Sequence, residues 1–348
     1  MQASLESIGF NMSKELLFLN GAHCVLPKRT KPQLLTGELW GITTFFNPLN
    51  HQNKIDNLRV FSERVRRQGL KLLIVEAVHV GQPSVFDHHD AEIVIHVETS
   101  GHLWQKERLL NIGERALPDS CDKIVWLDCD VLFEESGWVS RVSSLLNKFV
   151  VVQPFSSACW LLPDVDIANL NALGLTEYER TDIGTAYAEY GSSVFGPFLR
   201  GHMGFAWASR RSLFSGIGFY DRLILGGGDN LIASAMFGLS AMWLLERVFP
   251  LTGVDSAIKW MEEFHRRVEG SVYYVSGRIF HIWHGHRKNR MHDQRLDILK
   301  RNHFDPDNDI VLSSSGCWEW ATKKTNLHQE ISLYFESRRE EEKDLAMQ

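Results

Sequence analysis

The alternation of apolar runs with amphipathic segments over residues 39–128 constrains the fold more than any other feature of this sequence. Residues 53–68 and 103–117 carry apolar side chains at helical spacing. Runs rich in β-branched and aromatic residues predict four strands around them, at 39–46, 71–77, 91–97 and 122–128. Strands that alternate with helices indicate a parallel sheet covered by helices. We therefore expect an α/β fold, one large domain with a Rossmann-like, mostly parallel central sheet flanked by helices.

The composition fits such a domain and excludes other classes. The chain has 348 residues, of which 44% are hydrophobic and 23% charged, and its net charge is -6. This charge gives no basic excess for binding a nucleic-acid backbone, so no nucleic-acid partner is expected. The sequence has no apolar run of transmembrane length, no signal-peptide pattern and no CxxC pair among its five cysteines. We expect a cytoplasmic protein that acts on soluble or membrane-peripheral substrates.

Two aspartates end the fourth predicted strand, in the stretch KIVWLDCDVLF at residues 123–133. Ligands of open α/β sheets bind at the carboxyl ends of the strands, where Asp128 and Asp130 are expected. Two carboxylates so close together repel each other unless a cation lies between them, and carboxylate oxygens suit Mg²⁺ or Mn²⁺. Alternatively, one aspartate caps the next helix and the other is solvated. The apolar strand before the pair and the motifs downstream favour the metal site.

Two later motifs carry further candidate groups, LGGGDN at 225–230 and HIWHGH at 281–286. Three glycines before Asp229 allow the backbone to approach a ligand closely, although Asp229 could instead N-cap a helix that begins at Asn230. If 281–286 is a strand, His284 and His286 share a face and His281 points the other way. A zinc site of histidines alone, or packing of the rings on a strand, stays open as an alternative.

Four motifs taken together and in order resemble the metal-dependent GT-A glycosyltransferases. They are WQKERLLNIG, VWLDCDVLF, GHMGFAWASRRSLFSGIGFYDRLILGGGDN and HIWHGHRKNR, which begin at residues 104, 125, 201 and 281. The resemblance is strongest to the β-1,4-galactosyltransferases and to the galactosyl- and N-acetylgalactosaminyltransferase domains of polypeptide glycosylation and chondroitin synthesis. The resemblance covers residues 38–292. It is specific because the four motifs occur together and in order, whereas each motif alone is weak evidence for the family.

The resemblance implies a GT-A fold and a role for each matching residue. Asp130 would coordinate Mn²⁺ or Mg²⁺ together with a histidine, His284 before His286, and Asp128 would hold the ribose or a metal-bound water. Asp229 would deprotonate the acceptor hydroxyl, which favours inversion at the anomeric carbon. Donor-binding candidates at the remaining matching places are Thr43, Phe46, Glu76, Lys106, Arg108 and Arg287. Phe46 is also expected as an ordinary core residue, because aromatic side chains in strands usually pack inside.

The sequence pattern and the resemblance together suggest four parts of the chain. Residues 1–36 form an N-terminal extension, 37–155 the nucleotide-sugar-binding half that ends in the D-x-D motif, and 156–303 the acceptor and catalytic half. Residues 304–348 form a C-terminal extension whose charged end, ESRREEEKD, predicts a solvated helix or a frayed tail.

The leading hypothesis is a glycosyltransferase that moves a hexose or N-acetylhexosamine from a UDP-sugar to a carbohydrate or glycoconjugate acceptor. The family's GGED turn is reduced to Gly228-Asp229-Asn230 here, so an acid that helps bind the acceptor sugar is missing and the acceptor stays open. The alternatives are a retaining enzyme of the same fold and a non-catalytic module that binds sugar nucleotides or glycans. A D-x-D phosphatase is less favoured, since its carboxylate pair follows the first strand of its domain.

Overall fold

The central sheet of the protein has seven strands and is mostly parallel. A computed structural model of the chain describes residues 30–163, 165–167, 170, 176–181, 184, 201–249, 252–292 and 294–341. The strands run in the order β10-β6-β9-β4-β1-β2-β3, and only β9 is antiparallel to its neighbours. Their bounds are β1 Glu38–Phe46, β2 Lys71–His79, β3 Ile93–Thr99, β4 Cys121–Leu127, β6 Val151–Gln153, β9 Ala206–Arg210 and β10 Val272–Tyr274. The expected α/β fold with a mostly parallel central sheet is confirmed.

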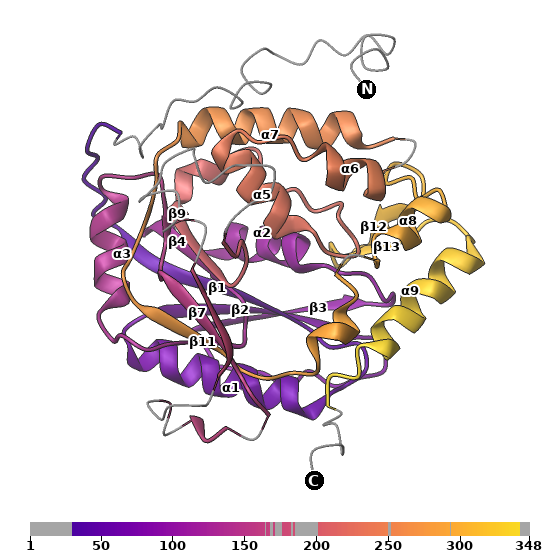
Figure 1. The fold of residues 1–348 in the computed structure, drawn as a ribbon, viewed down its shortest axis with the longest axis horizontal. Coiled ribbons are helices and arrows are strands. Elements are labelled where there is room, and N and C mark those ends of the chain that lie inside the picture. Colours follow the sequence, from indigo (N-terminus) through magenta and orange to yellow (C-terminus); the bar gives the residue numbers. More distant parts are fainter. Residues whose placement is uncertain are drawn as a thin grey trace.

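Helices cover both faces of this sheet (Figure 1). The α-helices of the described chain are α1 Gln52–Arg67, α2 Lys106–Ala116, α3 Trp138–Leu146, α5 Gly228–Phe237, α6 Met242–Val248, α7 Val254–Val268, α8 Asp297–Arg301 and α9 Thr325–Ser337, of which α8 and α9 lie beside the sheet. Successive residues of β2 point to opposite faces, as expected of a strand. Leu73 and Val75 join the core that contains α2, α5 and α7, whereas Leu72 and Ile74 join the core that contains α1 and α3. None of the described helices is both long and apolar enough to cross a membrane.

A second, four-stranded sheet brings the D-x-D motif and the late histidines together. It consists of β5 Val131–Phe133, β7 Ser157–Leu161, β8 Thr176–Thr181 and β11 Arg278–His281, in the order β5-β11-β7-β8. Strand β11 pairs antiparallel with β5, so that His281 lies opposite Val131, the residue after Asp130. Short 3-10 turns follow β9 at Arg211–Phe214 and β11 at Arg287–Arg290, and β12 Ile310–Leu312 pairs with β13 Trp318–Trp320.

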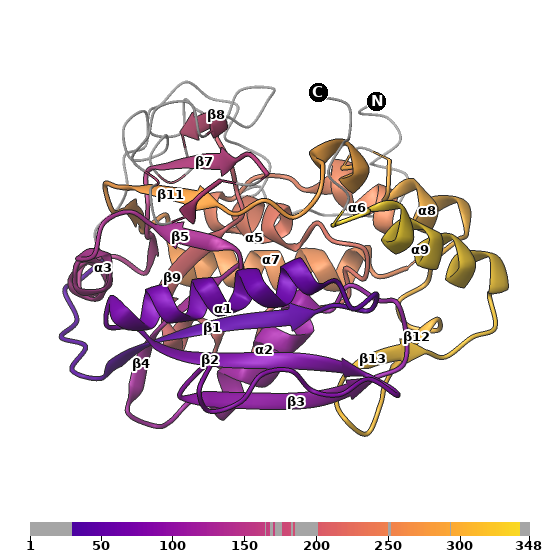
Figure 2. The ribbon, with the colours of Figure 1, turned by 90° about the horizontal axis from the view of Figure 1, so that it is seen from below.

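The C-terminal segment packs onto the domain, which differs from the solvated helix or frayed tail that we predicted. Helix α9 buries Leu327, Ile331, Tyr334 and Phe335, a helical stripe that the charged residues after it obscure in the sequence. Arg338 and Glu340 beyond it are each only 5% exposed. In the edge-on view of Figure 2, α9 lies at the end of the molecule where β1 and β3 finish. Most of the expected N-terminal extension, and most of residues 164–200 in the expected acceptor and catalytic half, lie outside the described residues.

Candidate active site

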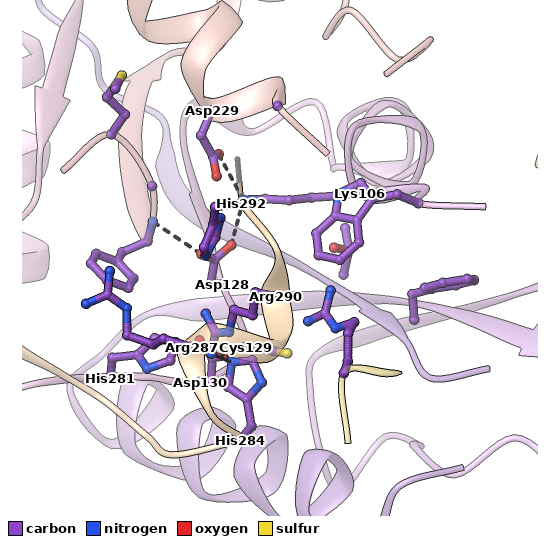
Figure 3. A pocket seen from close by; sticks show the side chains of 18 of the residues that line it. Lys106, Asp128, Cys129, Asp130, Asp229, His281, His284, Arg287, Arg290 and His292 are labelled. Carbon is purple, nitrogen blue, oxygen red and sulfur yellow. Dashed lines mark hydrogen bonds and ion pairs between the residues drawn. The ribbon is translucent and has the colours of Figure 1, made fainter. Parts of the chain in front are cut away.

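A cavity of about 360 Å³ lies where β1 and β4 end at their carboxyl termini. Its lining residues come from segments that are far apart in the sequence: the end of β1, the start of α2, the D-x-D motif, the turns before β9 and α5, the loop after β11 and the C-terminal segment. Figure 3 shows Asp128, Asp130 and Asp229 in this cavity together with the late histidines and arginines. The predicted position of the site at the carboxyl edge of the sheet agrees with this arrangement.

Asp130, His281 and His284 form a group whose ligand atoms all lie within 4.8 Å of one another. The Oδ2 atom of Asp130 is 2.8 Å from His284 Nε2 and 3.6 Å from His281 Nε2. Burial by itself would raise the pKa of Asp130, but the two neighbouring imidazoles hold it below its ordinary value. The other carboxylate oxygen, Oδ1, is buried and has no hydrogen-bond partner within the described part of the chain. A buried carboxylate oxygen of this kind is a suitable ligand for a cation.

The strand geometry that we used to choose His286 as a second candidate metal ligand is wrong. We assumed that residues 281–286 form one strand, with His281 on the face opposite to the metal. Strand β11 ends at His281, and a turn at Gly285, with φ 91°, changes the direction of the chain after it. As a result His281 joins His284 beside Asp130, and His286 does not belong to that group. The spacing H-x-x-H was visible in the sequence, but the end of the strand was not.

The side chains of Asp130, His281 and His284 fit a divalent metal ion. The presence of two imidazoles beside one carboxylate indicates which divalent ion fits best. Mg²⁺ prefers an all-oxygen shell, whereas imidazole nitrogen suits first-row transition ions. Burial lowers the pKa of His281 well below its usual value, more than Asp130 raises it, so this ring is neutral and able to ligate. Of the two ions expected from the sequence, Mn²⁺ therefore fits this group better than Mg²⁺.

Lys106 joins the two remaining aspartates of the cavity. Its Nζ atom lies 2.6 Å from Asp128 Oδ1 and 3.0 Å from Asp229 Oδ1. Dashed lines mark both contacts in Figure 3. Burial opposes the charge of Lys106, but the two carboxylates raise its pKa well above the usual value. The pKa of Asp128 rises to about 6 because of its burial, which Lys106 partly offsets and the nearby carboxylates of Asp229 and Asp130 reinforce. The backbone N–H of Phe205 also donates to Asp128 Oδ2, at 3.2 Å, which fixes this carboxylate in place.

Asp229 lies in the first turn of α5 and does not N-cap a helix that begins at Asn230. Helix α5 starts at Gly228, and its N-cap is Gly227, whose φ of 104° suits glycine. The side chain of Asp229 is 33% exposed in the cavity and is held by Lys106. A Cβ atom on Gly204 would lie 3.1 Å from Asp229 Oδ2, so the glycine allows β9 to begin close to this carboxylate.

Cationic side chains surround the same cavity. Lys54, Arg287, Arg290, Arg295 and Arg338 all line it, in addition to Lys106. Burial lowers the pKa of Arg290 to about 10, and Arg338 contributes to this shift. Burial, followed by the charges of Arg295 and Arg290, lowers the pKa of His292 to about 3. The cavity therefore combines a candidate cation site with a concentration of groups that bind anions.

Sequence reasoning found only some of these residues. Arg287 was predicted and lines the cavity, and its guanidinium lies 5.2 Å from the ring centre of Trp160. Arg290 stands in the same HGHRKNR motif and could have been included. Arg295, Arg338 and Glu340 lie beyond the last recognised motif, so no local pattern marked them.

Three of the predicted donor-binding residues lie outside the cavity and have other partners. The hydroxyl of Thr43 donates to the carbonyl of Leu127 within the sheet, and Thr44 lines the cavity in its place. Glu76 accepts hydrogen bonds from two backbone N–H groups of the loop before β3, at residues 85 and 86. Arg108 pairs with Asp221 at 3.1 Å. Phe46 does line the cavity, where it also contacts Phe335 of α9.

Comparisons with known proteins leave the family of this chain undefined. No protein-family model matches the sequence, and neither does any curated protein. Among solved structures, glucosyl-3-phosphoglycerate synthase from Mycobacterium tuberculosis aligns with 77% of this chain and 78% of its own, at 11% identity and a TM-score of 0.38. The catalytic domain of Drosophila β1,4-galactosyltransferase 7 aligns with 58% of this chain and 62% of its own, at 14% identity and a TM-score of 0.26.

A third similar solved structure is that of another synthase. It is 4-diphosphocytidyl-2C-methyl-D-erythritol synthase from Anaerococcus prevotii, which aligns with 69% of this chain and 86% of its own, at 13% identity and a TM-score of 0.30. Similarities with TM-scores below 0.5 carry no argument about function. We therefore infer the function of this chain from its own residues and their geometry.

Proposed function

We propose that this protein is a metal-dependent glycosyltransferase that takes a hexose or N-acetylhexosamine from a UDP-sugar and transfers it to a carbohydrate or glycoconjugate acceptor. The observation that carries the proposal is the convergence of three kinds of group on one cavity. Asp130 with two imidazoles offers a cation site, several guanidinium groups offer anion contacts, and Asp229 offers a carboxylate on the first turn of a helix. UDP as the nucleotide follows from the sequence resemblance described above.

The donor diphosphate would bind between the candidate metal site and the arginines. Asp130, His281 and His284 would hold the ion, and a bound ion would supply Lewis-acid stabilisation of the charge on the leaving diphosphate. Arg287 and Arg290 would bind phosphate oxygens, because a guanidinium fork matches their geometry. Asp128 is held by Lys106 and by the N–H of Phe205, and this orientation suits a hydrogen bond to the ribose or to a metal-bound water.

Asp229 would act as the general base on the acceptor hydroxyl. The contact with Lys106 fixes the direction of the Asp229 side chain, and its partial exposure leaves it accessible from the cavity. A base placed to activate the acceptor favours attack on the anomeric carbon from the side opposite to the diphosphate, and therefore inversion. A retaining reaction would not require this carboxylate.

The test is the release of UDP from a panel of common UDP-sugars by purified protein in the presence of Mn²⁺. We expect one donor to give UDP, slowly with water and faster with a saccharide acceptor. Asp130→Ala should abolish the release, whereas Asp119→Ala, an exposed aspartate outside the cavity, should leave it unchanged. Release of inorganic phosphate that Asp128→Asn silences would indicate a phosphatase instead. A protein that binds UDP-sugars with Mn²⁺ but never releases UDP would be a non-catalytic binding module.

A further inference from the structure

The four residues that follow α9, Arg338 to Glu341, form an arm that lies between α1 and the loop that carries His284. The carboxylate of Glu341 accepts hydrogen bonds from the backbone N–H groups of Gln52 and Asn53, the second at 3.2 Å. The side chain of Asn53 donates to the carbonyl of Glu340. At the other end, Asn289 donates to the carbonyl of Arg338 at 3.3 Å. We call residues 338–341 the C-terminal arm.

The local sequence on both sides is suited to receiving this arm. Helix α1 begins after His51, which provides no side-chain cap, so the first N–H groups of the helix need acceptors from elsewhere. Glu341 supplies a carboxylate, the kind of group that the N-terminus of a helix favours. On the loop side, a Cβ atom on Gly285 would lie 2.9 Å from Glu340 Cα, so the glycine permits the approach of the arm.

Glu340 reaches from the arm to the candidate metal group. Its Oε1 atom lies 3.3 Å from His284 Nδ1 and accepts two hydrogen bonds from Arg338, at 2.6 and 3.1 Å. Its Oε2 atom lies 3.2 Å from the ammonium of Lys54. Groups on both sides therefore fix this carboxylate, which is 5% exposed, against the ring of His284.

The contacts of His284 indicate which ring nitrogen carries the hydrogen. An ionised carboxylate can only accept, so Nδ1–H donates to Glu340 Oε1 and Nε2 is the nitrogen that faces the cavity. Asp130 Oδ2 and Arg290 Nη2 each lie 2.8 Å from Nε2. The ring therefore turns Nε2 toward Asp130, as a ligand of a shared cation must.

We propose that Glu340 is a positioning residue that fixes the ring and tautomer of His284 for metal binding, so that the C-terminal arm is part of the active site. Carboxylates that hold the second nitrogen of a ligating histidine orient the ring and raise its basicity. The inference rests on the proposed function, because it assumes that Asp130, His281 and His284 bind a metal ion. It adds a part of the chain, beyond the last recognised motif, without which this site is incomplete.

The experiment measures Mn²⁺ affinity of the full chain by the EPR signal of free Mn²⁺, for the wild type, Glu340→Gln, Glu340→Asp and Glu336→Gln. Glu336→Gln is the control, because it removes the same charge from an exposed residue of α9 that lies just before the arm and outside the cavity. We expect Glu340→Gln to weaken Mn²⁺ binding by about 10- to 100-fold, Glu340→Asp to restore part of it, and Glu336→Gln to have no effect. Pulsed EPR of the bound ion should show two coupled imidazole nitrogens in the wild type and a weakened coupling of one of them in Glu340→Gln.

Three results would overturn the inference, and they differ from one another. Unchanged Mn²⁺ affinity in a folded Glu340→Gln protein would show that Glu340 does not act on the metal site. Tighter UDP binding in that variant, with Mn²⁺ affinity unchanged, would show that Glu340 competes with the substrate for Lys54 and Arg338. A wild-type protein that binds neither Mn²⁺ nor another divalent ion would contradict the metal site itself and with it the proposed function.

Discussion

Lys106 is the residue on which the proposed chemistry depends most closely, because it contacts a carboxylate on each side of the cavity. Asp128 directly follows β4 and Asp229 lies in the first turn of α5, and the ammonium lies within 3.0 Å of both. The sequence predicted Lys106 as a donor-binding residue because of its place in the WQKERLLNIG motif. Its link to Asp229, 123 residues away, arises from the packing of α2 against α5 and has no counterpart in a local pattern.

Replacing Asp229 tests its role as a base. Asp229→Asn keeps the size of the side chain and a contact with Lys106 but removes the proton acceptor. We expect turnover to fall by about 10²- to 10⁴-fold while the affinities for Mn²⁺ and UDP change little. Steady-state rates and calorimetric titrations on the same preparation would check this. Full activity of the Asn variant would exclude Asp229 as the base.

The buried carboxyl of Glu107, beside Lys106, should make the free energy of unfolding depend on pH. Burial raises the pKa of its carboxyl from 4.5 to about 8, so the native state keeps a proton that the unfolded chain has lost between these pH values. The free energy of unfolding of the wild type should therefore fall as the pH rises from 4.5 to 8. The Glu107→Gln variant has no carboxyl to ionise, so its free energy of unfolding should not fall for this reason. Relative to the wild type it should therefore gain on the order of 4 kcal/mol between pH 4.5 and 8. Urea denaturation at several pH values would measure it, and a difference independent of pH would contradict the account.

At the scale of elements, the sequence predicted the first half of the sheet because each strand there is a run rich in β-branched and aromatic residues. The runs at 39–46, 71–77, 91–97 and 122–128 correspond to β1 to β4. The insertion of β9 between β4 and β6 was not predicted, because β9 pairs antiparallel with two strands that are both distant in the sequence. The position of His281 and the C-terminal arm depend on similarly distant pairings. Local periodicity carries no information about them.

Gly228, the first residue of α5, tests the contact between this helix and α2. A Cβ atom at Gly228 would lie 1.8 Å from Oε1 of the buried Glu107, so a larger residue requires either the carboxyl or the helix to shift. We expect Gly228→Ala to lower the free energy of unfolding by about 1–3 kcal/mol and to disturb Asp229. Gly101→Ala is the control, since its nearest atoms would be 3.6 Å away. Equal stability of the two variants, by chemical denaturation, would contradict the packing described here.

On the scale of the whole molecule, the fold places one cavity where two sheets and the C-terminal segment meet. The central sheet contributes Asp128 at the end of β4, the second sheet contributes His281, and the helices contribute Lys106 and Asp229. These groups combine a cation site with several anion-binding side chains, and such a site binds a metal ion and a diphosphate together. If both ligands bind there, each should strengthen the binding of the other.

The most direct test of this claim is a calorimetric titration of UDP into the wild-type protein with and without Mn²⁺, and into Asp130→Ala. We predict that Mn²⁺ strengthens UDP binding at least about 10-fold, that UDP strengthens Mn²⁺ binding by the same factor, and that Mg²⁺ has a smaller effect. Asp130→Ala should lose the coupling but still fold. UDP affinity that is independent of the metal, or a coupling that survives in Asp130→Ala, would contradict the site proposed here.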